Sequence, residues 1–375
     1  MVDLARKNLL HDKLRFFITI SGVAFAVTLV MVQVGLFLGL LDNASVVIEH
    51  ADADLWVTSK NTPNVDFAHP FFETLVSRVR STPGVKYADN LILTFMDVAL
   101  PNGAQETSVI YALEDFKRWN LPWRLESGHL DNLRSGKYVA IDTSATKRFG
   151  SFALGDYREY LGQRLKISAI TQEAKSFTTT PISFMRYGLA QAISGPRLFG
   201  KTTYILVKLE QGANLEKVRA DLKQRLPYND VYTRGEWAKR SRAYWVVSTG
   251  LGFNMVVTVF LGCLVGIVVV AQTLYTSTME HIKEFGTVKA IGGSNRDIYR
   301  ILGWQAIISA VIGFFVGLIP TFAMGPVVAR GGLHLLIPPS FIMIVFVGTL
   351  LMCLLAAMVS FRKVAAIDPA LVFRG

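Results

Sequence analysis

The sequence predicts a membrane protein with four transmembrane α-helices and a large extracytoplasmic mixed α+β domain between the first and second helices. Three observations support this fold class: 51% of the 375 residues are hydrophobic, four apolar runs are long enough to cross a bilayer, and about 200 more polar residues separate the first two runs. A span needs roughly 20 apolar residues, because each residue advances a helix by about 1.5 Å across about 30 Å of hydrocarbon.

The first apolar run follows a short basic segment. Residues 1–15 mix leucines with Lys and Arg, which suits an amphipathic helix on the inner membrane surface, and an irregular basic flank is the alternative. A secretory signal peptide is disfavoured, because a signal core has about 7 to 15 apolar residues before its cleavage site. Here the run covers residues 16–41, and the A-x-A pattern from Ala24 to Ala26 lies in its middle.

Lys and Arg in the short segments beside the spans set the expected orientation. They precede the first span, lie between the second and third and follow the fourth, whereas the segment between the third and fourth carries only Arg330. Both termini and the loop between the second and third spans are therefore predicted to be cytoplasmic. The predicted organisation is a cytoplasmic amphipathic segment at 1–15, spans at 16–41, 244–271, 301–324 and 341–361, an extracytoplasmic α+β domain at 42–243, a cytoplasmic loop at 272–300, a short outer loop at 325–340 and a cytoplasmic tail at 362–375.

The predicted extracytoplasmic domain alternates between β-rich runs and helical patterns. Asn102 and Gly103 form a hairpin signal between LILTFMDVAL and SVIYAL, and residues 214–226 repeat Leu and Val at helical spacing. Both cysteines, Cys263 and Cys353, lie in predicted spans, so we expect no disulfide in this domain. A domain of this size can instead be held together by its own hydrophobic core.

Composition disfavours several classes of function. The net charge is +11, but the basic residues are interspersed with many acidic ones and do not form a basic stripe. This distribution argues against nucleic-acid binding. The six histidines are scattered without ligand spacing, so no metal site is predicted, and no catalytic constellation is recognisable. The spans contain almost no ionisable residue, which disfavours an ion-coupled carrier. Energy for any transport must come from elsewhere.

One segment matches the phosphate-binding P-loop pattern G-x-x-x-x-G-K-[ST]. It reads GPRLFGKT, and its matching residues are Gly195, Gly200, Lys201 and Thr202. A working P-loop joins a strand to a following helix, whereas here a helical pattern precedes the motif and a β-rich run follows it. We interpret the match as coincidental, as a Gly/Pro loop that leads into a strand, and predict that no cofactor is bound directly.

Three spans contain glycines four residues apart. This spacing places both glycines on one helix face and permits close helix approach. Such close approach could occur either at a dimer interface or between helices of one chain. The pairs are Gly35 with Gly39, Gly262 with Gly266, and Gly313 with Gly317.

The cytoplasmic loop carries the most informative pattern. A helix is expected to continue from the second span, to break at Gly292 and Gly293, and to restart after Ser294 or Asn295, either of which can cap it. Its apolar residues and flanking charges suit docking into a groove of a cytoplasmic partner, and an ordinary solvated loop is the alternative.

Two segments of this chain resemble signatures of the FtsX-like permease family. MEHIKEFGTVKAIGGSNRDIYR resembles the family's loop motif, in which a charged stretch containing E-F-G precedes a K-A-[IL]-G element, and RKVAAIDPALVFRG resembles its ending. The family often has a basic residue early in the loop, where this chain has His281. The residues that match the ATPase-facing motif are Glu280, Glu284, Phe285, Gly286, Lys289, Ala290 and Gly292.

The resemblance implies a homodimeric ABC permease of the MacB and LolC/LolE type, most similar to DevC-type subunits, in the bacterial inner membrane. Such a subunit is not an enzyme: ATP is hydrolysed by a separate cytoplasmic ABC ATPase, and the permease transmits the resulting movement to its outer domain. Relatives work with a periplasmic membrane-fusion adaptor and an outer-membrane channel, and a lipid or hydrophobic substrate is compatible with spans that lack charges.

The resemblance leaves an alternative function open. FtsX-type relatives use the same architecture as non-transporting signal transmitters, although their outer domains are much smaller. A membrane-tethered enzyme is a third class, but no group of residues in the sequence supports it. The large domain of this chain therefore favours an exporter.

Overall fold

The computed structural model describes residues 13–178, 180–280, 294–330 and 333–365. They form two compact units. The membrane unit comprises residues 1–39 and 253–375, and the outer unit comprises residues 40–252.

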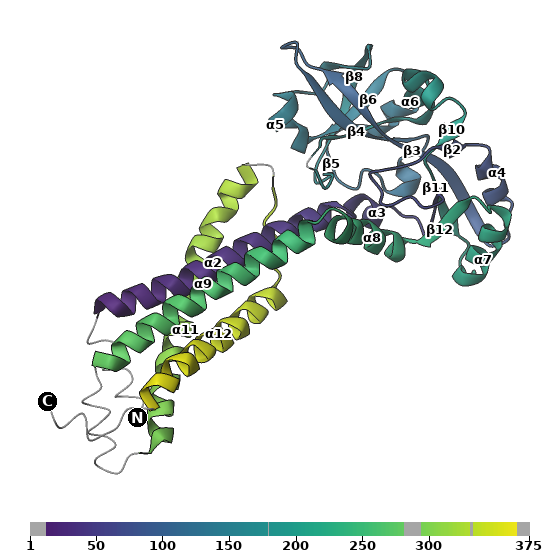
Figure 1. The fold of residues 1–375 in the computed structure, drawn as a ribbon. Helices are drawn as coiled ribbons and strands as arrows, with labels where there is room; N and C mark the ends of the chain where they lie inside the picture. Colours follow the sequence, from purple (N-terminus) through teal and green to yellow (C-terminus); the bar gives the residue numbers. More distant parts are fainter. Residues whose placement is uncertain (1–12, 179, 281–293, 331–332, 366–375) are drawn as a thin grey trace, which may run out of the picture. The chain divides into compact units, whose positions relative to one another are not determined.

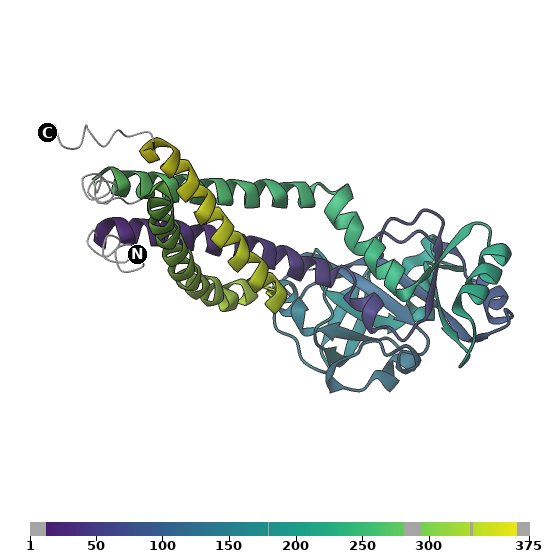
Figure 2. The same ribbon diagram turned by 90° about the horizontal axis from the view of Figure 1, so that it is seen from below.

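The described residues of the membrane unit contain four long helices: α2 (Lys13–Asn43), α9 (Leu251–Glu280), α11 (Asn295–Arg330) and α12 (Pro339–Ala365). In the described residues, these four are long and apolar enough to cross a membrane. Figure 1 and Figure 2 show α11 and α12 crossing closely in both views. The predicted four-helix architecture is confirmed.

The second membrane helix begins later than the sequence suggests. The predicted span starts at Tyr244, but residues 244–248 form a π-helical turn that belongs to the outer unit, and α9 starts at Leu251. The reason is aromatic packing, because Trp245 stacks on Phe177 with ring centroids 3.9 Å apart. An apolar turn buried in a soluble core has the same composition as the start of a span, so hydropathy alone cannot separate them.

The helices also extend beyond the apolar runs. α9 continues to Glu280 rather than ending near residue 271, and α11 continues to Arg330 through two internal prolines. Prolines are tolerated in membrane helices because neighbouring groups can satisfy the backbone carbonyls that they leave free. The outer loop predicted at 325–340 is correspondingly shorter, and its described part is residues 333–338.

Small and aliphatic side chains form the core of the membrane unit. Val27 of α2, Val270 of α9, Ala310 of α11 and Cys353 of α12 are all buried in one hydrophobic cluster. A hydrogen bond adds to this packing, because the Thr28 hydroxyl donates to the Gly317 carbonyl oxygen at 2.9 Å. Helices in a membrane associate through such close packing and hydrogen bonds, since lipid tails are as apolar as leucine.

The outer unit is a mixed α+β domain, as predicted. Its 10-stranded sheet has the order β12-β1-β11-β3-β4-β9-β6-β8-β5, with β7 pairing β3 and β8 (Figure 1). The strands are β1 (Leu55–Ser59), β3 (Val85–Ala99), β4 (Gln105–Leu113), β5 (Leu125–Gly128), β6 (Tyr138–Asp142), β7 (Tyr157–Tyr160), β8 (Gln163–Thr171), β9 (Ile182–Arg186), β11 (Tyr204–Leu209) and β12 (Asn229–Thr233), and a separate two-stranded ribbon pairs β2 (Phe71–Phe72) with β10 (Lys201–Thr202).

Short helices surround this sheet. The predicted helix at 214–226 is α7, and the Asn214 side chain caps it by accepting a hydrogen bond from the Lys217 amide at 3.1 Å. A capping box between Thr233 and Glu236 starts α8. The helices of the outer unit are α3 (Val46–His50), α4 (Leu75–Arg80), α5 (Thr146–Phe149), α6 (Tyr187–Ser194), α7 (Leu215–Arg225) and α8 (Arg234–Ala243).

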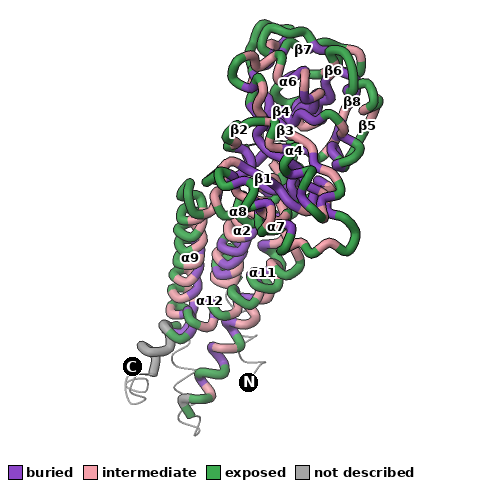
Figure 3. The backbone as a smooth tube through the Cα atoms, turned by 90° about the vertical axis from the view of Figure 1, so that its right-hand side faces the viewer, coloured by how far each residue is buried: buried purple, intermediate pink, exposed green. Residues whose placement is uncertain are grey.

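The long strand β3 joins the two halves of the outer unit. Residues 85–91 pair with β11, and residues 92–99 pair with β4 across the predicted hairpin. Leu91 and Ile92, which lie side by side on β3, belong to two different buried clusters. Figure 3 shows buried positions concentrated in the strands of this unit. Successive side chains of a strand point to opposite faces of the sheet, so β3 contributes to a core on each face. The cluster that contains Leu91 extends across the sheet, from Tyr204 of β11 to Val109 of β4.

Candidate transmembrane and coupling sites

All six glycines of the predicted pairs contact another element of the same chain. On each, an added Cβ atom would lie within 3.0 Å of an atom from a neighbouring element. Gly313 and Gly317 of α11 approach Val23 and Ala24 of α2, where those distances would be 2.6 and 2.8 Å. Close approach at these glycines thus occurs within one chain.

One further contact of the same kind involves a glycine outside the three predicted pairs. A Cβ on Gly22 of α2 would lie 2.4 Å from Val269 Cγ1 of α9. The available signal was the small residue Ala26 four positions later, which also gives the small-xxx-small spacing. Other glycines behave differently, because Gly325 of α11 and Gly348 of α12 would have no atom within 4 Å of an added Cβ.

The C-terminal part of α2 packs against the segment at 333–338. The Leu336 amide donates a hydrogen bond to the Gly35 carbonyl oxygen at 3.0 Å. One turn further along, a Cβ on Gly39 would lie only 1.9 Å from the carbonyl oxygen of His334. The carbonyl oxygen and carbonyl carbon of His334, the two nearest atoms, both belong to the backbone. Only a residue without a side chain therefore fits at Gly39.

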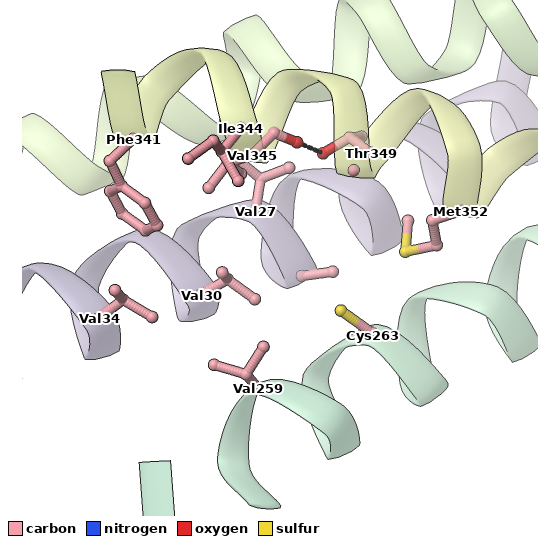
Figure 4. A pocket seen from close by; sticks show the side chains of 12 residues that line it. Val27, Val30, Val34, Val259, Cys263, Phe341, Ile344, Val345, Thr349 and Met352 are labelled. Atoms are coloured by element: carbon pink, nitrogen blue, oxygen red, sulfur yellow. Dashed lines mark hydrogen bonds between the residues drawn. The ribbon is translucent and has the colours of Figure 1, made fainter. Parts of the chain in front are cut away.

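An apolar pocket opens between α2, α9 and α12 (Figure 4). Its volume is about 250 Å³. The single hydroxyl in its wall, that of Thr349, donates to the Val345 carbonyl oxygen at 2.7 Å. The lining residues are Ala26, Val27, Val30 and Val34 of α2, Val259 and Cys263 of α9, and Phe341, Ile344, Val345, Gly348, Thr349 and Met352 of α12.

The outer unit contains a buried carboxyl group next to the aromatic turn that precedes α9. Burial raises the pKa of Asp66 from 3.8 to about 7, and the Trp245 indole opposes that shift only in part. Burial also raises the pKa values of Tyr111 and Tyr204, and the nearby Asp66 contributes in the same direction. Among the described residues, no three His, Cys, Asp or Glu side chains are grouped to hold a metal ion.

Two family models match this chain. Residues 16–225 match the MacB-like periplasmic core domain, and residues 256–369 match the C-terminal domain of FtsX-like permeases. The first match alone covers more than half of the chain. The chain belongs to the MacB- and FtsX-like permease family.

Similar proteins carry consistent names. A protein of Mycobacterium bovis and one of Mycobacterium tuberculosis, both named uncharacterised ABC transporter permeases, are each 25% identical to this permease over 100% of both chains. The periplasmic region of MacB from Actinobacillus actinomycetemcomitans is 11% identical, with a TM-score of 0.40 over 50% of this chain and 92% of that one. The extracellular domain of YknZ from Gram-positive bacteria is 14% identical, with a TM-score of 0.37 over 48% and 99%.

These findings identify a multi-pass membrane subunit of an ABC transporter. The relatives are named permeases, which implies a non-catalytic subunit. Membership of the ABC class implies a cytoplasmic ATPase partner. The resemblance inferred from the loop and the C-terminal signature is thereby confirmed at the level of the family.

The structure describes only part of the permease's predicted ATPase-coupling motif. Glu280, the last residue of α9, forms an ion pair with Arg15 in the first turn of α2, and the side chains are 53% and 26% exposed. On the far side of the loop, Ser294 precedes α11, and its amide and hydroxyl both donate to the Asp297 carboxylate, at 2.9 and 2.8 Å. The other motif residues, Glu284, Phe285, Gly286, Lys289, Ala290 and Gly292, lie outside the described residues.

The P-loop-like segment of the permease has the order of elements that the sequence suggested. α6 precedes it, its last two residues form β10, and β11 follows it. The amides of Phe199 and Lys201 donate to carbonyl oxygens of Gly195 and Leu198 in the same loop, at 3.1 and 3.0 Å. The Thr202 hydroxyl is buried and donates to backbone carbonyl oxygens. These amides and this hydroxyl already have protein partners, whereas a P-loop directs such groups at phosphate.

Proposed function

We propose that this permease transmits the nucleotide cycle of a separate cytoplasmic ABC ATPase to its outer domain, and that it acts as a homodimeric exporter subunit. Under this proposal both termini are in the cytoplasm and the protein lies in the bacterial inner membrane. The observation that carries the proposal is the continuity of α9, which begins in the outer unit at Leu251 and ends at Glu280, where the coupling motif begins.

The position of Glu280 supports a mechanical role. Any displacement of the coupling segment by an ATPase would act on the end of α9 and, through Arg15, on the end of α2. α2 also contacts α9 and α11 through glycines along its length. Small shifts in such packed helices are transmitted because close-packed interfaces resist continuous deformation.

A wider assembly follows from the DevC-type resemblance. We propose that a periplasmic membrane-fusion adaptor and an outer-membrane channel continue the export path beyond the outer domain. The size of that domain, residues 40–252, supports this proposal over a non-transporting signal transmitter of the FtsX type. The substrate class proposed is lipid or another hydrophobic molecule, in keeping with membrane helices that contain few ionisable residues.

Association with the ATPase tests the proposal directly. We expect purification of the tagged permease from its native membrane in mild detergent to recover a soluble ABC ATPase with ATP-hydrolysing activity. The Phe285→Asp variant should recover at least about tenfold less ATPase, because a charge would enter an apolar contact at a cost above about 1.4 kcal/mol.

A matched variant controls for the chemistry of this substitution. Phe199→Asp places the same charge on an outer-domain side chain that is 79% exposed, and it should leave ATPase recovery unchanged. Equal recovery with Phe285→Asp and the unmodified permease would remove Phe285 from the interface. Failure to recover any ATPase, under conditions that preserve other membrane complexes, would count against the proposed function as a whole.

Charge reversal at the end of α9 tests the Arg15–Glu280 pair, with recovery of the ATPase measured on the same variants. Because both partners are partly exposed, the Arg15–Glu280 pair stabilises the fold by at most about 1 kcal/mol. We therefore expect Glu280→Arg to change the melting temperature little but to reduce the stimulation of ATPase activity by the permease. The double variant Arg15→Glu with Glu280→Arg should restore stimulation, and a double variant as impaired as the single one would refute a role for the pair.

A further inference from the structure

The apolar pocket between α2, α9 and α12 is elongated along the helices. Its lining on α12 runs from Phe341 to Met352, a distance of about 16 Å at about 1.5 Å per helical residue. On α2 it runs in the opposite direction, from Val34 to Ala26. Figure 4 shows Phe341 and Val34 at one end and Met352 at the other. The pocket therefore lies lengthwise along the helices, and one end is close to the start of α12.

The chemistry of the wall restricts what can occupy this pocket. A buried water needs two to four hydrogen-bonding partners. The Thr349 hydroxyl is the one hydroxyl in the lining, and it already donates to the Val345 carbonyl oxygen. Water and polar head groups are therefore excluded from the interior, whereas hydrocarbon matches the aliphatic lining.

The size of the pocket limits what it can enclose. A helix with its side chains is about 10 Å wide, so a volume of about 250 Å³ along about 16 Å is too small to enclose one. A single extended hydrocarbon chain fits that shape. In the bilayer core, phospholipid acyl chains are the hydrocarbon that surrounds every membrane helix, so they reach this pocket without crossing a polar region.

We infer that the pocket binds one acyl chain of a membrane phospholipid, with the head group at the end near Phe341. Under the orientation proposed above, this end faces the outer leaflet. The bound chain contacts α2, α9 and α12 together, so its affinity depends on the spacing of these three helices. Lipid binding needs no ATPase, and a failure of the proposed function would leave this inference untouched.

Gly348 allows the pocket to be filled without disturbing the helices. It lines the pocket, and an added Cβ there would meet no atom within 4 Å. A Gly348→Phe side chain can therefore take the place of the acyl chain. Gly325 of α11 is equally open but does not line the pocket, so Gly325→Phe is the matched control. Gly348→Leu is a smaller filling variant, to be used if the phenylalanine variant is not monodisperse.

The test places the purified full-length permease in nanodiscs of phosphatidylethanolamine and phosphatidylglycerol. A small fraction of the phosphatidylglycerol carries a diazirine in the middle of one acyl chain. After irradiation, mass spectrometry measures adducts on the pocket-lining residues. Adducts on Phe315 and Ile319 of α11, which are 59% and 69% exposed, measure non-specific contact with surrounding lipid.

We expect pocket adducts to exceed this reference about tenfold in the unmodified permease, a preference of about 1.4 kcal/mol. They should fall to the reference level in Gly348→Phe and stay high in Gly325→Phe. Adducts spread evenly over all helices, or unchanged by Gly348→Phe, would show surrounding lipid only and overturn the inference. Oxidative cross-linking of Cys263 between two copies, without pocket adducts, would assign the pocket to a second copy and overturn it as well.

Discussion

At pH 8, the outer domain of an Asp66→Asn variant is expected to be more stable than that of the unmodified permease by up to about 4 kcal/mol. Burial raises the pKa of Asp66 in the folded state to about 7, against 3.8 for the exposed group. Each pKa unit corresponds to about 1.4 kcal/mol, so the difference between the folded-state and unfolded-state pKa of Asp66 sets the size of the stability gain.

The sign of the pH dependence follows from proton binding. Between about pH 4 and pH 7 the folded protein holds a proton on Asp66 that the unfolded chain has released, so stability falls as the pH rises through this window. Below about pH 4 both states are protonated, and the unmodified protein should resemble the asparagine variant. Above about pH 7 the folded unmodified protein carries a buried charge on Asp66, and its stability difference from the asparagine variant reaches its full value.

Urea denaturation of the full-length permease in detergent, with proteolysis of the outer domain as the readout, measures this difference from pH 4 to pH 8. Asp97→Asn is the control, because Asp97 is an exposed residue of β3 in the same sheet. That substitution should leave the pH profile unchanged. An Asp66→Asn profile parallel to that of the unmodified protein would show that the Asp66 carboxyl does not titrate in this window.

Gly39→Ala is expected to destabilise the membrane unit by about 3 kcal/mol, at the upper end of what overpacking usually costs. The new Cβ would lie 1.9 Å from the His334 carbonyl oxygen and 2.9 Å from the His334 carbonyl carbon. Because these are backbone atoms, no change of side-chain rotamer relieves the clash. Either α2 or the segment at 333–338 must move, and the hydrogen bond from Leu336 to Gly35 is then strained or lost.

Thermal unfolding of the purified permease in detergent, followed by loss of the monodisperse peak in size-exclusion chromatography, measures this effect. Gly325→Ala makes the same chemical change where no atom lies within 4 Å, so its transition temperature should match that of the unmodified protein. Equal transition temperatures for the two variants would contradict the close packing of α2 against the segment at 333–338.

The sequence predicted the architecture well because its main signals are local. A run of apolar residues reports a membrane helix, and the Asn102-Gly103 turn correctly marked the β3–β4 hairpin. The start of α9 was predicted too early because burial of Trp245 depends on Phe177, about 70 residues away in the chain. Hydropathy contains no information about such a distant partner.

The candidate sites depended even more on contacts that are distant in sequence. The lining of the acyl-chain pocket comes from three helices, and no one of them carries a pattern that sets it apart from ordinary membrane helix. The raised pKa of Asp66 likewise results from burial, and the one residue that opposes the shift, Trp245, is far along the chain. By contrast, the coupling motif is contiguous, and its family could therefore be recognised from letters alone.

The continuous strand β3 gives the outer domain a mechanical direction. It is hydrogen-bonded to β11 over one half and to β4 over the other. A pull along the strand axis loads many of these hydrogen bonds in parallel, as shear, whereas a pull across the sheet opens them one at a time, like a zipper. Under the proposed function, the domain would therefore act as a stiff rod along β3 and a compliant sheet across it, so the direction in which the helices pull would matter as much as the force.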